Sequence, residues 1–402
     1  MTASLFAAVE MAPRDPILGL TESFNADTRS TKVNLGVGVY FDGNGKIPLL
    51  AAVKAAEKAR LEAMPARGYQ PIDGLASYNQ AVQKLLFGAD SALLEAGRVA
   101  TVEALGGTGA LKVGADYLRR LLPDARVFIS DPSWENHRAL FEFAGFEVDS
   151  YPYYDAETRG VDFAAMKAGL NSLPAGSIVV LHACCHNPTG ADLNQAQWQE
   201  VIAAVSARGL VAFVDIAYQG FADGITEDAQ VLQLFAASGL QFFVASSFSK
   251  SFSLYGERVG ALTAITENRE ESARVLSQLK RVVRTNYSNP PTHGGAVVAA
   301  VLTDPALRAQ WEDELAGMRD RIREMRAALV EKIAAAGVEQ DFSFVVRQRG
   351  MFSFTGLSVE QVEALKQDFG IYAVSSGRIC LAALNSKNIN AVAQAIAAVI
   401  KG

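Results

Sequence analysis

Cysteine and histidine are scarce in this sequence of 402 residues, with 3 of the first and 4 of the second. Two of the cysteines, Cys184 and Cys185, are adjacent, so no disulfide framework is expected and a reducing, cytoplasmic setting is the default. His182, Cys184 and His186 alternate and could share one face of a strand. Because ligands from one segment without a second cluster make a poor zinc site, no metal site is predicted. A Ser–His–Asp or Cys–His hydrolase is unsupported, since no nucleophile elbow occurs.

Excess positive charge and long apolar runs are also lacking. The net charge of −6 gives no basic surface for nucleic acid. No apolar stretch approaches the about 20 residues that span a bilayer, so no membrane partner is expected. Residues 1–6 lack the basic region and apolar core of a signal peptide, and none is expected. The composition, half hydrophobic and a fifth charged, is ordinary for a soluble globular enzyme.

Short apolar runs alternate with helical patterns from about residue 100 to 265. Asn194 and Gln197 form a capping-box pattern before an apolar helical stripe that ends at Gly209. Such alternation predicts an α/β fold with a mostly parallel sheet covered on both faces, which binds ligands beyond the carboxyl ends of its strands. The predicted strands are 126–130, 178–182, 211–215, 242–246 and 259–265.

A long helix leads from this region to a second, smaller α+β domain. Asp304 and Pro305 signal its start, and its apolar stripe lasts until Gly337, as expected of a domain connector or a core-facing helix. The elements predicted beyond it are strands at 342–346 and 351–354 and helices at 358–370 and 389–400.

The N-terminal residues 1–47 read as irregular, with turn signals at Pro13 and Pro16. They are expected to join the small domain. The large domain then covers 48–320, and the small domain combines 1–47 with 321–402.

Lys250 is the most informative residue for function. It follows an apolar run and lies among serines, with Ser247 before it and Arg258 eight residues after it. A buried amine near a cation has a lowered pKa, which suits Schiff-base chemistry, while a serine and an arginine suit a phosphate. The plainer interpretation is a surface lysine in a serine-rich loop.

A glycine-rich turn at residues 105–112 opens a helical pattern and includes Gly107 and Thr108. Glycines let a phosphate approach the backbone, and a helix N-terminus offers free N–H groups. The spacing fits neither the dinucleotide fingerprint nor the P-loop, which disfavours an NAD-dependent enzyme. An ordinary glycine-rich turn remains the alternative.

Three further candidates follow predicted strands. Asp215 would be buried at a strand end, where a protonated ring nitrogen is a fitting partner, and Tyr218 could donate to the same ring. Asn187 precedes a Pro–Thr–Gly turn, and Trp134 could stack on a flat ring. The plainer alternatives are a helix cap for Asp215 and core packing for Trp134.

Two arginines are candidates for carboxylate binding, Arg378 in the small domain and Arg284. Either alone is explained as well by a structural salt bridge. The functional interpretation is favoured because all these candidates together would form one site. That site would contain an amine, donors for a phosphate, a carboxylate for a ring nitrogen and arginines that bind carboxylates.

In this order the segments resemble the class I, fold type I, pyridoxal-phosphate aminotransferases, in the aspartate/aromatic branch. The similarity covers nearly the whole chain. Its motifs are residues 13–20, 34–40, 106–111, 184–190, 215–221, 249–250, 255–260, 286–291 and 376–378.

The resemblance implies a seven-stranded, mostly parallel sheet in the large domain and a role for each candidate. Lys250 would form the Schiff base with pyridoxal 5′-phosphate and move the Cα proton, Asp215 would keep the pyridine nitrogen protonated, and Trp134 would stack on the ring. The phenolate ligands would be Tyr218 and Asn187, and the phosphate ligands Gly107, Thr108, Ser247, Arg258 and the partner subunit's Tyr69. The substrate α-carboxylate would be held by Arg378, Asn187 and the backbone near Gly38, and a distal carboxylate by the partner subunit's Arg284.

The activity implied is a ping-pong transfer of the α-amino group of an aromatic amino acid or aspartate to 2-oxoglutarate, by a homodimer with shared sites. Residues 68–74 and the Asp192 region look somewhat more like the aromatic enzymes. A strict aspartate aminotransferase and a β-lyase on the same fold remain alternatives. A decarboxylase would not need the second arginine, and a transcription regulator would need a basic extension that this chain lacks.

Overall fold

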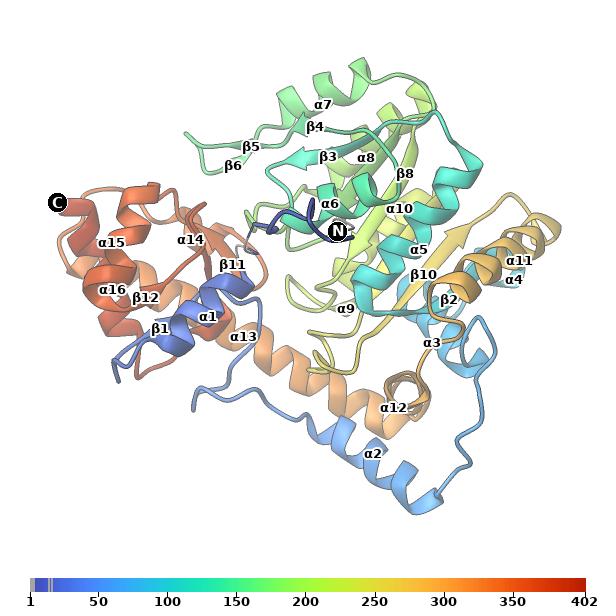
Figure 1. Cartoon of the computed structure of the whole chain (residues 1–402), viewed down its shortest axis with the longest axis horizontal. Helices are drawn as coiled ribbons and strands as arrows, with labels where there is room; N and C mark the ends of the chain where they lie inside the picture. Colours follow the sequence, from blue (N-terminus) through green and yellow to red (C-terminus); the bar gives the residue numbers. More distant parts are fainter. Residues whose placement is uncertain (1–3, 14, 16) are drawn as a thin grey trace.

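The computed structural model describes residues 4–13, 15 and 17–402. Residues 1–3, Arg14 and Pro16 lie outside these, and so does the turn predicted at Pro16. Figure 1 gives the arrangement of the elements. The helices are α1 (Leu18–Ala26), α2 (Ala51–Ala63), α3 (Ala76–Phe87), α4 (Ala92–Glu95), α5 (Gly106–Leu121), α6 (Glu135–Phe143), α7 (Phe163–Ser172), α8 (Gln195–Arg208), α9 (Ile225–Asp228), α10 (Gln230–Ala237), α11 (Arg269–Asn286), α12 (Thr292–Thr303), α13 (Pro305–Ala335), α14 (Phe344–Arg347), α15 (Val359–Phe369), α16 (Ile389–Lys401) and the 3-10 turn η1 (Leu381–Ala383). The strands are β1 (Val33–Asn34), β2 (Val99–Leu105), β3 (Val127–Asp131), β4 (Val148–Pro152), β5 (Tyr154–Asp155), β6 (Gly160–Val161), β7 (Ile178–His182), β8 (Val211–Ile216), β9 (Phe242–Ser247), β10 (Val259–Ile265), β11 (Phe352–Phe354), β12 (Ile371–Tyr372) and β13 (Arg378–Cys380).

In the described part of the chain, seven strands form the main sheet, in the order β2-β10-β9-β8-β7-β3-β4. Strand β10 runs antiparallel to both of its neighbours, and the other pairs are parallel. The five predicted strands are confirmed to within one residue at each end. The α/β class and the mostly parallel sheet are therefore confirmed.

The continuous apolar runs of the central strands follow from burial on both faces of the sheet. On β7, Ile178 and Val180 pack in the cluster that contains the apolar side of α5. The alternate residues Val179 and Leu181 pack in the cluster that contains the apolar side of α8. Because successive side chains point to opposite faces, a strand buried on both sides needs an apolar residue at every position.

The parallel direction brings several chain segments to one edge of the sheet. Strands β3, β7, β8 and β9 end there, and β2, which runs the same way, ends there before entering α5 at Gly106. His182 and Asp215 are paired in register at the ends of β7 and β8. Polar residues that are far apart in the sequence are thus neighbours at this edge.

The C-terminal elements form a separate small unit that the N-terminal residues join, as Figure 1 shows. Strand β1 pairs in parallel with β12, and Phe24 of α1 packs edge-on against Tyr372 at 5.4 Å between ring centroids. Helix α13 begins at the predicted Asp304 cap and runs without a break through residue 320, packing against α2 and α12 and against α14 and α16. It therefore connects the small unit to the large one.

Three sequence predictions about elements were wrong. Residues 342–346 were expected to form a strand, but α14 begins there because the Asp341 carboxylate accepts the Ser343 N–H at 2.7 Å and bends the chain into a turn. The N-terminal residues are not wholly irregular, since α1 and β1 form on the small unit. Strands β2 and β4 were missed, because Glu103 interrupts the apolar run of the first and the second is a largely exposed edge strand.

Candidate active site

A cavity of about 260 Å³ opens at the carboxyl edge of the sheet. All the predicted site residues except Tyr69 and Arg284 line it, namely Gly38, Gly107, Thr108, Trp134, Asn187, Asp215, Tyr218, Ser247, Lys250, Arg258 and Arg378. The sheet topology is the reason, since these residues follow strands that end at this edge or belong to segments of the small unit packed against it.

Lys250 lies three residues beyond the end of β9, with Nζ 4.9 Å from the centre of the Tyr218 ring. Burial lowers the pKa of its amine to about 8; Asp215 opposes this shift, while the charges of Arg258 and Arg378 add to it. An amine with this pKa is about one-tenth unprotonated at pH 7, far more than an ordinary lysine. It is therefore a competent nucleophile and proton acceptor.

Asp215 is buried at the end of β8, and its Oδ2 accepts a hydrogen bond from His137 Nε2 at 3.0 Å. Burial by itself raises the pKa of this carboxyl, but the His137 hydrogen bond and the neighbouring positive charges outweigh it, so the pKa lies below its ordinary value. The carboxylate therefore stays ionised inside the protein and suits a protonated ring nitrogen.

Sequence reasoning missed the hydrogen-bonded side chains behind Asp215. Ser133 Oγ lies 2.9 Å from His137 Nδ1 and 3.3 Å from His182 Nε2. Burial lowers the pKa of His182 to about 3, so this imidazole is neutral. The spacing of Ser133 and His137, one turn apart at the start of α6, is a signal in the sequence, but only the fold places them beneath Asp215.

The first turn of α5 and the segment after β9 form a cradle of donors. The N-cap residue of α5, Leu105, makes no side-chain capping bond, so among the described residues the N–H groups near Gly107 and Thr108 lack a cap. Arg258 Nη1 donates to Ser249 Oγ at 3.2 Å, and Ser247 Oγ donates to the same oxygen at 3.2 Å. A Cβ on Gly107 would lie 3.1 Å from Ser247 Cβ, so glycine keeps the cradle open. The donors are those that bind a phosphate group.

Arg378 is 1% exposed and fixed over the cavity from the small unit. Its Nη1 donates to Asn187 Oδ1 at 3.1 Å and its Nη2 to the Gly36 carbonyl at 2.7 Å, while the guanidinium lies 4.4 Å from the centre of the Phe352 ring. Within the described residues its buried Nε has no hydrogen-bond partner. A free buried donor of this kind fits an incoming carboxylate. Phe352, which also lines the cavity, was not singled out from the sequence.

Tyr69 and Arg284 are the two predicted residues that the fold does not bring to this cavity. Tyr69 is 97% exposed. Arg284 is also exposed, at the end of α11, and its Nη1 donates a hydrogen bond to Ser288 Oγ. Both side chains are on the surface of the chain, where a neighbouring subunit could contact them.

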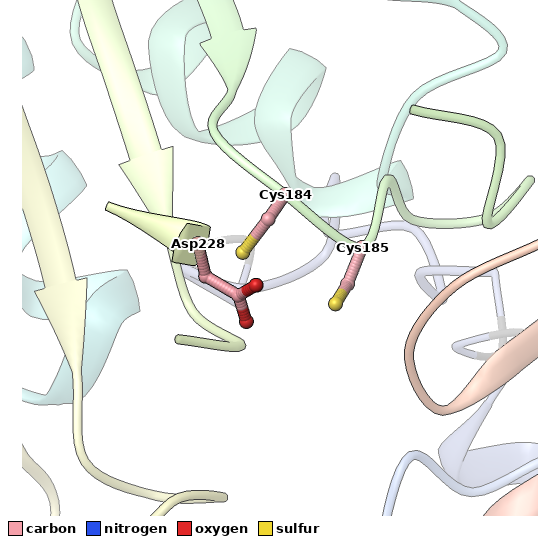
Figure 2. A group of neighbouring side chains, drawn as sticks. All are labelled: Cys184, Cys185 and Asp228. Atoms are coloured by element: carbon pink, nitrogen blue, oxygen red, sulfur yellow. The ribbon is translucent and has the colours of Figure 1, made fainter. Parts of the chain in front are cut away.

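Cys184, Cys185 and Asp228 are residues of types that bind metal ions, and their side chains approach one another, as Figure 2 shows. The sequence predicts no metal site. The Asp228 carboxylate already accepts four backbone N–H bonds, from Gly220, Ala222, Asp223 and Gly224. A hydrogen bond with Cys185 and burial raise the pKa of the Cys184 thiol well above its ordinary value, and burial raises that of Cys185 to about 11. The four bonds to the Asp228 carboxylate hold the turn at residues 220–224, which gives this carboxylate a structural role without a metal ion.

These groups together fit the pyridoxal phosphate that the sequence resemblance implies. The buried amine of Lys250 suits its aldehyde, Asp215 suits its ring nitrogen, and the cradle at α5 suits its phosphate. The guanidinium of Arg378, which also lines the cavity, suits the carboxylate of an amino acid.

Comparison with known proteins agrees with this fit. A family model described as aminotransferase class I and II matches residues 30–396. An aspartate aminotransferase of Pseudomonas aeruginosa is 68% identical over 397 residues, which cover 99% of this chain and 100% of that protein. An aromatic-amino-acid aminotransferase of Escherichia coli is 53% identical, covering 98% and 100%. The crystal structure of an aromatic-amino-acid aminotransferase from Burkholderia pseudomallei, covalently bound to pyridoxal phosphate, is 68% identical with a TM-score of 0.97 and covers 99% of this chain and 100% of that chain.

Proposed function

Because the chain belongs to the class I and II aminotransferase family, we propose that it transfers the α-amino group of aspartate and of aromatic amino acids to 2-oxoglutarate, with a preference for the aromatic ones. It is a pyridoxal-phosphate-dependent enzyme that acts on amino acids and 2-oxo acids. The observation that carries the proposal is one cavity lined by the half-buried amine of Lys250, the buried carboxylate of Asp215 and the buried guanidinium of Arg378.

When bound, the cofactor supplies an aldehyde for Schiff-base chemistry and a ring that withdraws electrons from the substrate Cα. Asp215, held by His137, would keep a proton on the ring nitrogen. The free Nζ of Lys250, with its pKa of about 8, would take the proton from the substrate Cα and give it to C4′, the former aldehyde carbon of the cofactor. Trp134 would orient the ring by stacking on it, and Tyr218 would orient it by holding its phenolate oxygen.

The substrate would be positioned by its carboxylates. Arg378 and Asn187, already bonded to each other, would hold the α-carboxylate together with the backbone near Gly38. The phosphate would be bound by the first turn of α5, at Gly107 and Thr108, and by Ser247 and Arg258. Fixing both ends of the reacting unit orients the Cα–H bond toward Lys250.

We further propose a homodimer whose two sites are shared, with the partner subunit's Tyr69 at the phosphate and the partner subunit's Arg284 at a distal carboxylate. The exposure of both side chains supports this proposal. None of the helices in the described part of the chain has the length and apolar character of a membrane span. A cytoplasmic location is our proposal from the three free cysteines.

The experiment that tests the function compares kcat/KM for aspartate, phenylalanine and tyrosine, each with 2-oxoglutarate as acceptor. We expect turnover of all three, strict dependence on the acceptor, and the larger kcat/KM for the aromatic substrates. Turnover of aspartate alone would remove the aromatic preference. Product formation without any 2-oxo acid would contradict transamination and favour a β-lyase.

A further inference from the structure

Arg326, in the middle of α13, is an unusual residue for the core. It is 2% exposed, and all of its side-chain hydrogen bonds in the described structure go to backbone carbonyls: Nη1 donates to Val345 at 2.7 Å, and Nη2 donates to Gly350 at 2.7 Å and to Phe352 at 2.6 Å. Burial lowers the pKa of its guanidinium to about 10, which reflects the cost of keeping a charge there. Since apolar side chains can replace buried charges with little loss of stability, stability alone is a poor reason for this arginine.

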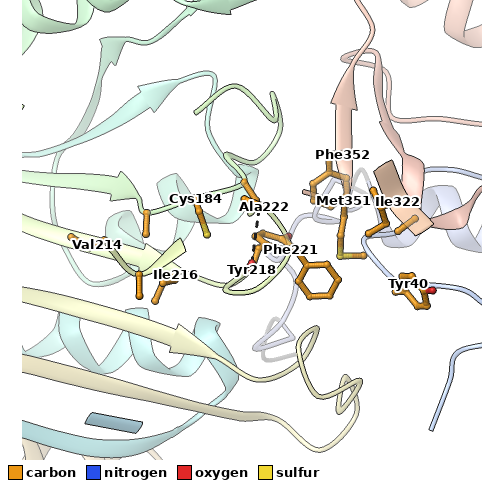
Figure 3. Close-up of a cluster of buried hydrophobic side chains, with 14 of the residues drawn as sticks. Tyr40, Cys184, Val214, Ile216, Tyr218, Phe221, Ala222, Ile322, Met351 and Phe352 are labelled. Atoms are coloured by element: carbon orange, nitrogen blue, oxygen red, sulfur yellow. Dashed lines mark hydrogen bonds between the residues drawn. The ribbon is translucent and has the colours of Figure 1, made fainter. Parts of the chain in front are cut away.

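The segment that Arg326 binds, residues 345–352, ends at Phe352, which lines the active-site cavity. Its Phe352 ring lies under the Arg378 guanidinium at 4.4 Å and edge-on to the Tyr218 ring at 5.9 Å. A Cβ on Gly38 would lie 2.7 Å from Phe352 Cζ, so the ring also contacts the backbone near Gly38. Figure 3 shows Phe352 in one cluster with Tyr218 and with Ile322, which lies one turn before Arg326 on α13.

The same segment supports the turn that carries Asn187. The Arg349 N–H donates to the Gly190 carbonyl at 2.7 Å, and a Cβ on Gly190 would lie 2.9 Å from the Phe352 carbonyl oxygen. That oxygen is one of the three that Arg326 binds. The positions of Asn187 and Arg378, which hydrogen-bond each other, therefore depend on one segment fixed by one guanidinium.

We propose that Arg326 is a positioning residue for the substrate α-carboxylate: by binding three carbonyls of residues 345–352 it fixes Phe352, and through Phe352 and the Asn187 turn it sets the position of the Arg378 guanidinium. The inference rests on the proposed role of Arg378. The guanidinium reaches the three carbonyls from two nitrogens held in one plane, whereas a lysine ammonium would have to reach them from a single nitrogen, so lysine is an incomplete substitute.

The test compares Arg326→Met and Arg326→Lys with Arg323→Met in the holoenzyme. Arg323 is a matched control, because it lies one turn earlier on α13 and donates to the Ala222 carbonyl and to Asp223 at the surface. The measurements are KM for amino acid and 2-oxoglutarate, the Kd of two carboxylate probes, succinate and 3-phenylpropionate, and the pH titration of the cofactor absorbance.

We expect Arg326→Met to raise both KM values and both probe Kd values by about tenfold or more, since small misplacements of a positioning group have effects of this size. Arg326→Lys should recover part of the loss, and Arg323→Met should match the wild type. The titration of the cofactor absorbance should shift in Arg326→Met and not in Arg323→Met, because the charge of Arg378 contributes to the lowered pKa of Lys250.

Unchanged KM and probe Kd values in Arg326→Met would overturn the inference, even if its melting temperature fell. If Arg326→Met does not fold, Arg326→Lys decides in the same way: raised values support the inference and wild-type values overturn it. Arg378→Lys distinguishes a failure of the positioning role of Arg326 from a failure of the carboxylate-binding role of Arg378. Raised KM in Arg378→Lys with wild-type behaviour in the Arg326 variants refutes only the positioning role, whereas no effect of Arg378→Lys refutes the proposed carboxylate grip itself.

Discussion

Burial shifts the pKa values of individual residues in directions that suit their place in the fold. It lowers the pKa of Lys250 to about 8, and the hydrogen bond from His137 keeps Asp215 ionised despite burial. The proposed cofactor needs one free amine and one anion, and these two residues would supply them. Both residues are identifiable in the sequence, because Asp215 directly follows an apolar run and Lys250 follows one after a short serine-rich segment.

Glu103 on β2 shows the same effect outside the active site and gives a pH prediction. It is 2% exposed and accepts one hydrogen bond, from the Leu75 N–H at 3.3 Å, and burial raises its pKa from 4.5 to about 7. A folded-state pKa above the unfolded one means that the folded protein binds more protons between pH 4.5 and 7. The free energy of unfolding therefore falls as pH rises through this window, by up to about 3 kcal/mol for this one group.

Glu103→Gln, which cannot ionise, should lack this loss. Relative to the wild type, its stability in urea unfolding should improve between pH 5 and pH 8 by up to about 3 kcal/mol. Glu62→Gln, an exposed glutamate on α2, is the control and should show no such trend. A stability difference between Glu103→Gln and wild type that does not change with pH would refute the buried, raised pKa.

Other residues of the site could not be identified from the sequence. Ser133 and His137 matter because α6 places them beneath Asp215, and Phe352 matters because the small unit packs on the large one. Their neighbours in the sequence carry no trace of these long-range contacts. The cavity residues that sequence reasoning identified mostly follow strand ends. The residues that it missed reach the site through packing between distant elements.

At the scale of elements, the local signals were reliable where side chains bond nearby backbone. The capping box at Asn194 and the cap at Asp304 are confirmed, and the helix predicted from residue 358 begins at a capping box of Ser358 and Gln361. These motifs work because donor and acceptor lie within one helical turn. Strands β2 and β4 escaped prediction, because strand identity depends on partners that are distant in the sequence.

The junction between β2 and α5 leads to a prediction about cofactor binding. A Cβ on Gly260 of β10 would lie 2.4 Å from the backbone carbon of Gly106, where α5 begins, and 2.7 Å from the Ser246 carbonyl oxygen. Gly260→Ala must therefore displace the first turn of α5. Overpacking of this kind costs about 1–3 kcal/mol, so the Kd for pyridoxal phosphate should rise about ten- to a hundredfold.

The control for Gly260→Ala is Gly256→Ala, because a Cβ on Gly256 meets no atom within 4 Å. Titration of the apoenzyme with pyridoxal phosphate, followed by absorbance, measures both Kd values. Wild-type affinity in a folded Gly260→Ala variant would show that the α5 turn does not bind the phosphate.

At the scale of the whole molecule, the large and small units meet at the active site, with α13 connecting them. We keep the division into 48–320 and 1–47 with 321–402 as a proposal; it agrees with the pairing of β1 with β12. The sequence indicated this arrangement through the long apolar stripe of α13. It contained no pattern for the two-subunit site, which rests on the resemblance and on the exposure of Tyr69 and Arg284.

Hybrid dimers test that shared site. Lys250→Ala and Arg284→Leu should each be inactive toward aspartate as homodimers. After mixing, unfolding and refolding, a hybrid dimer contains one site with an intact Lys250 and an intact Arg284 from the partner. Random pairing should therefore restore about a quarter of the wild-type activity. An active Arg284→Leu homodimer, or a mixture without any recovery although hybrids form, would refute the shared site.

The central claim is that the buried amine of Lys250 holds the cofactor, and reductive trapping tests it most directly. The holoenzyme is treated with borohydride, digested and sequenced by mass spectrometry. We predict that the visible absorbance disappears and that the pyridoxyl group is found on Lys250. A label on another lysine, or a holoenzyme from which reduction traps no cofactor, would contradict the account.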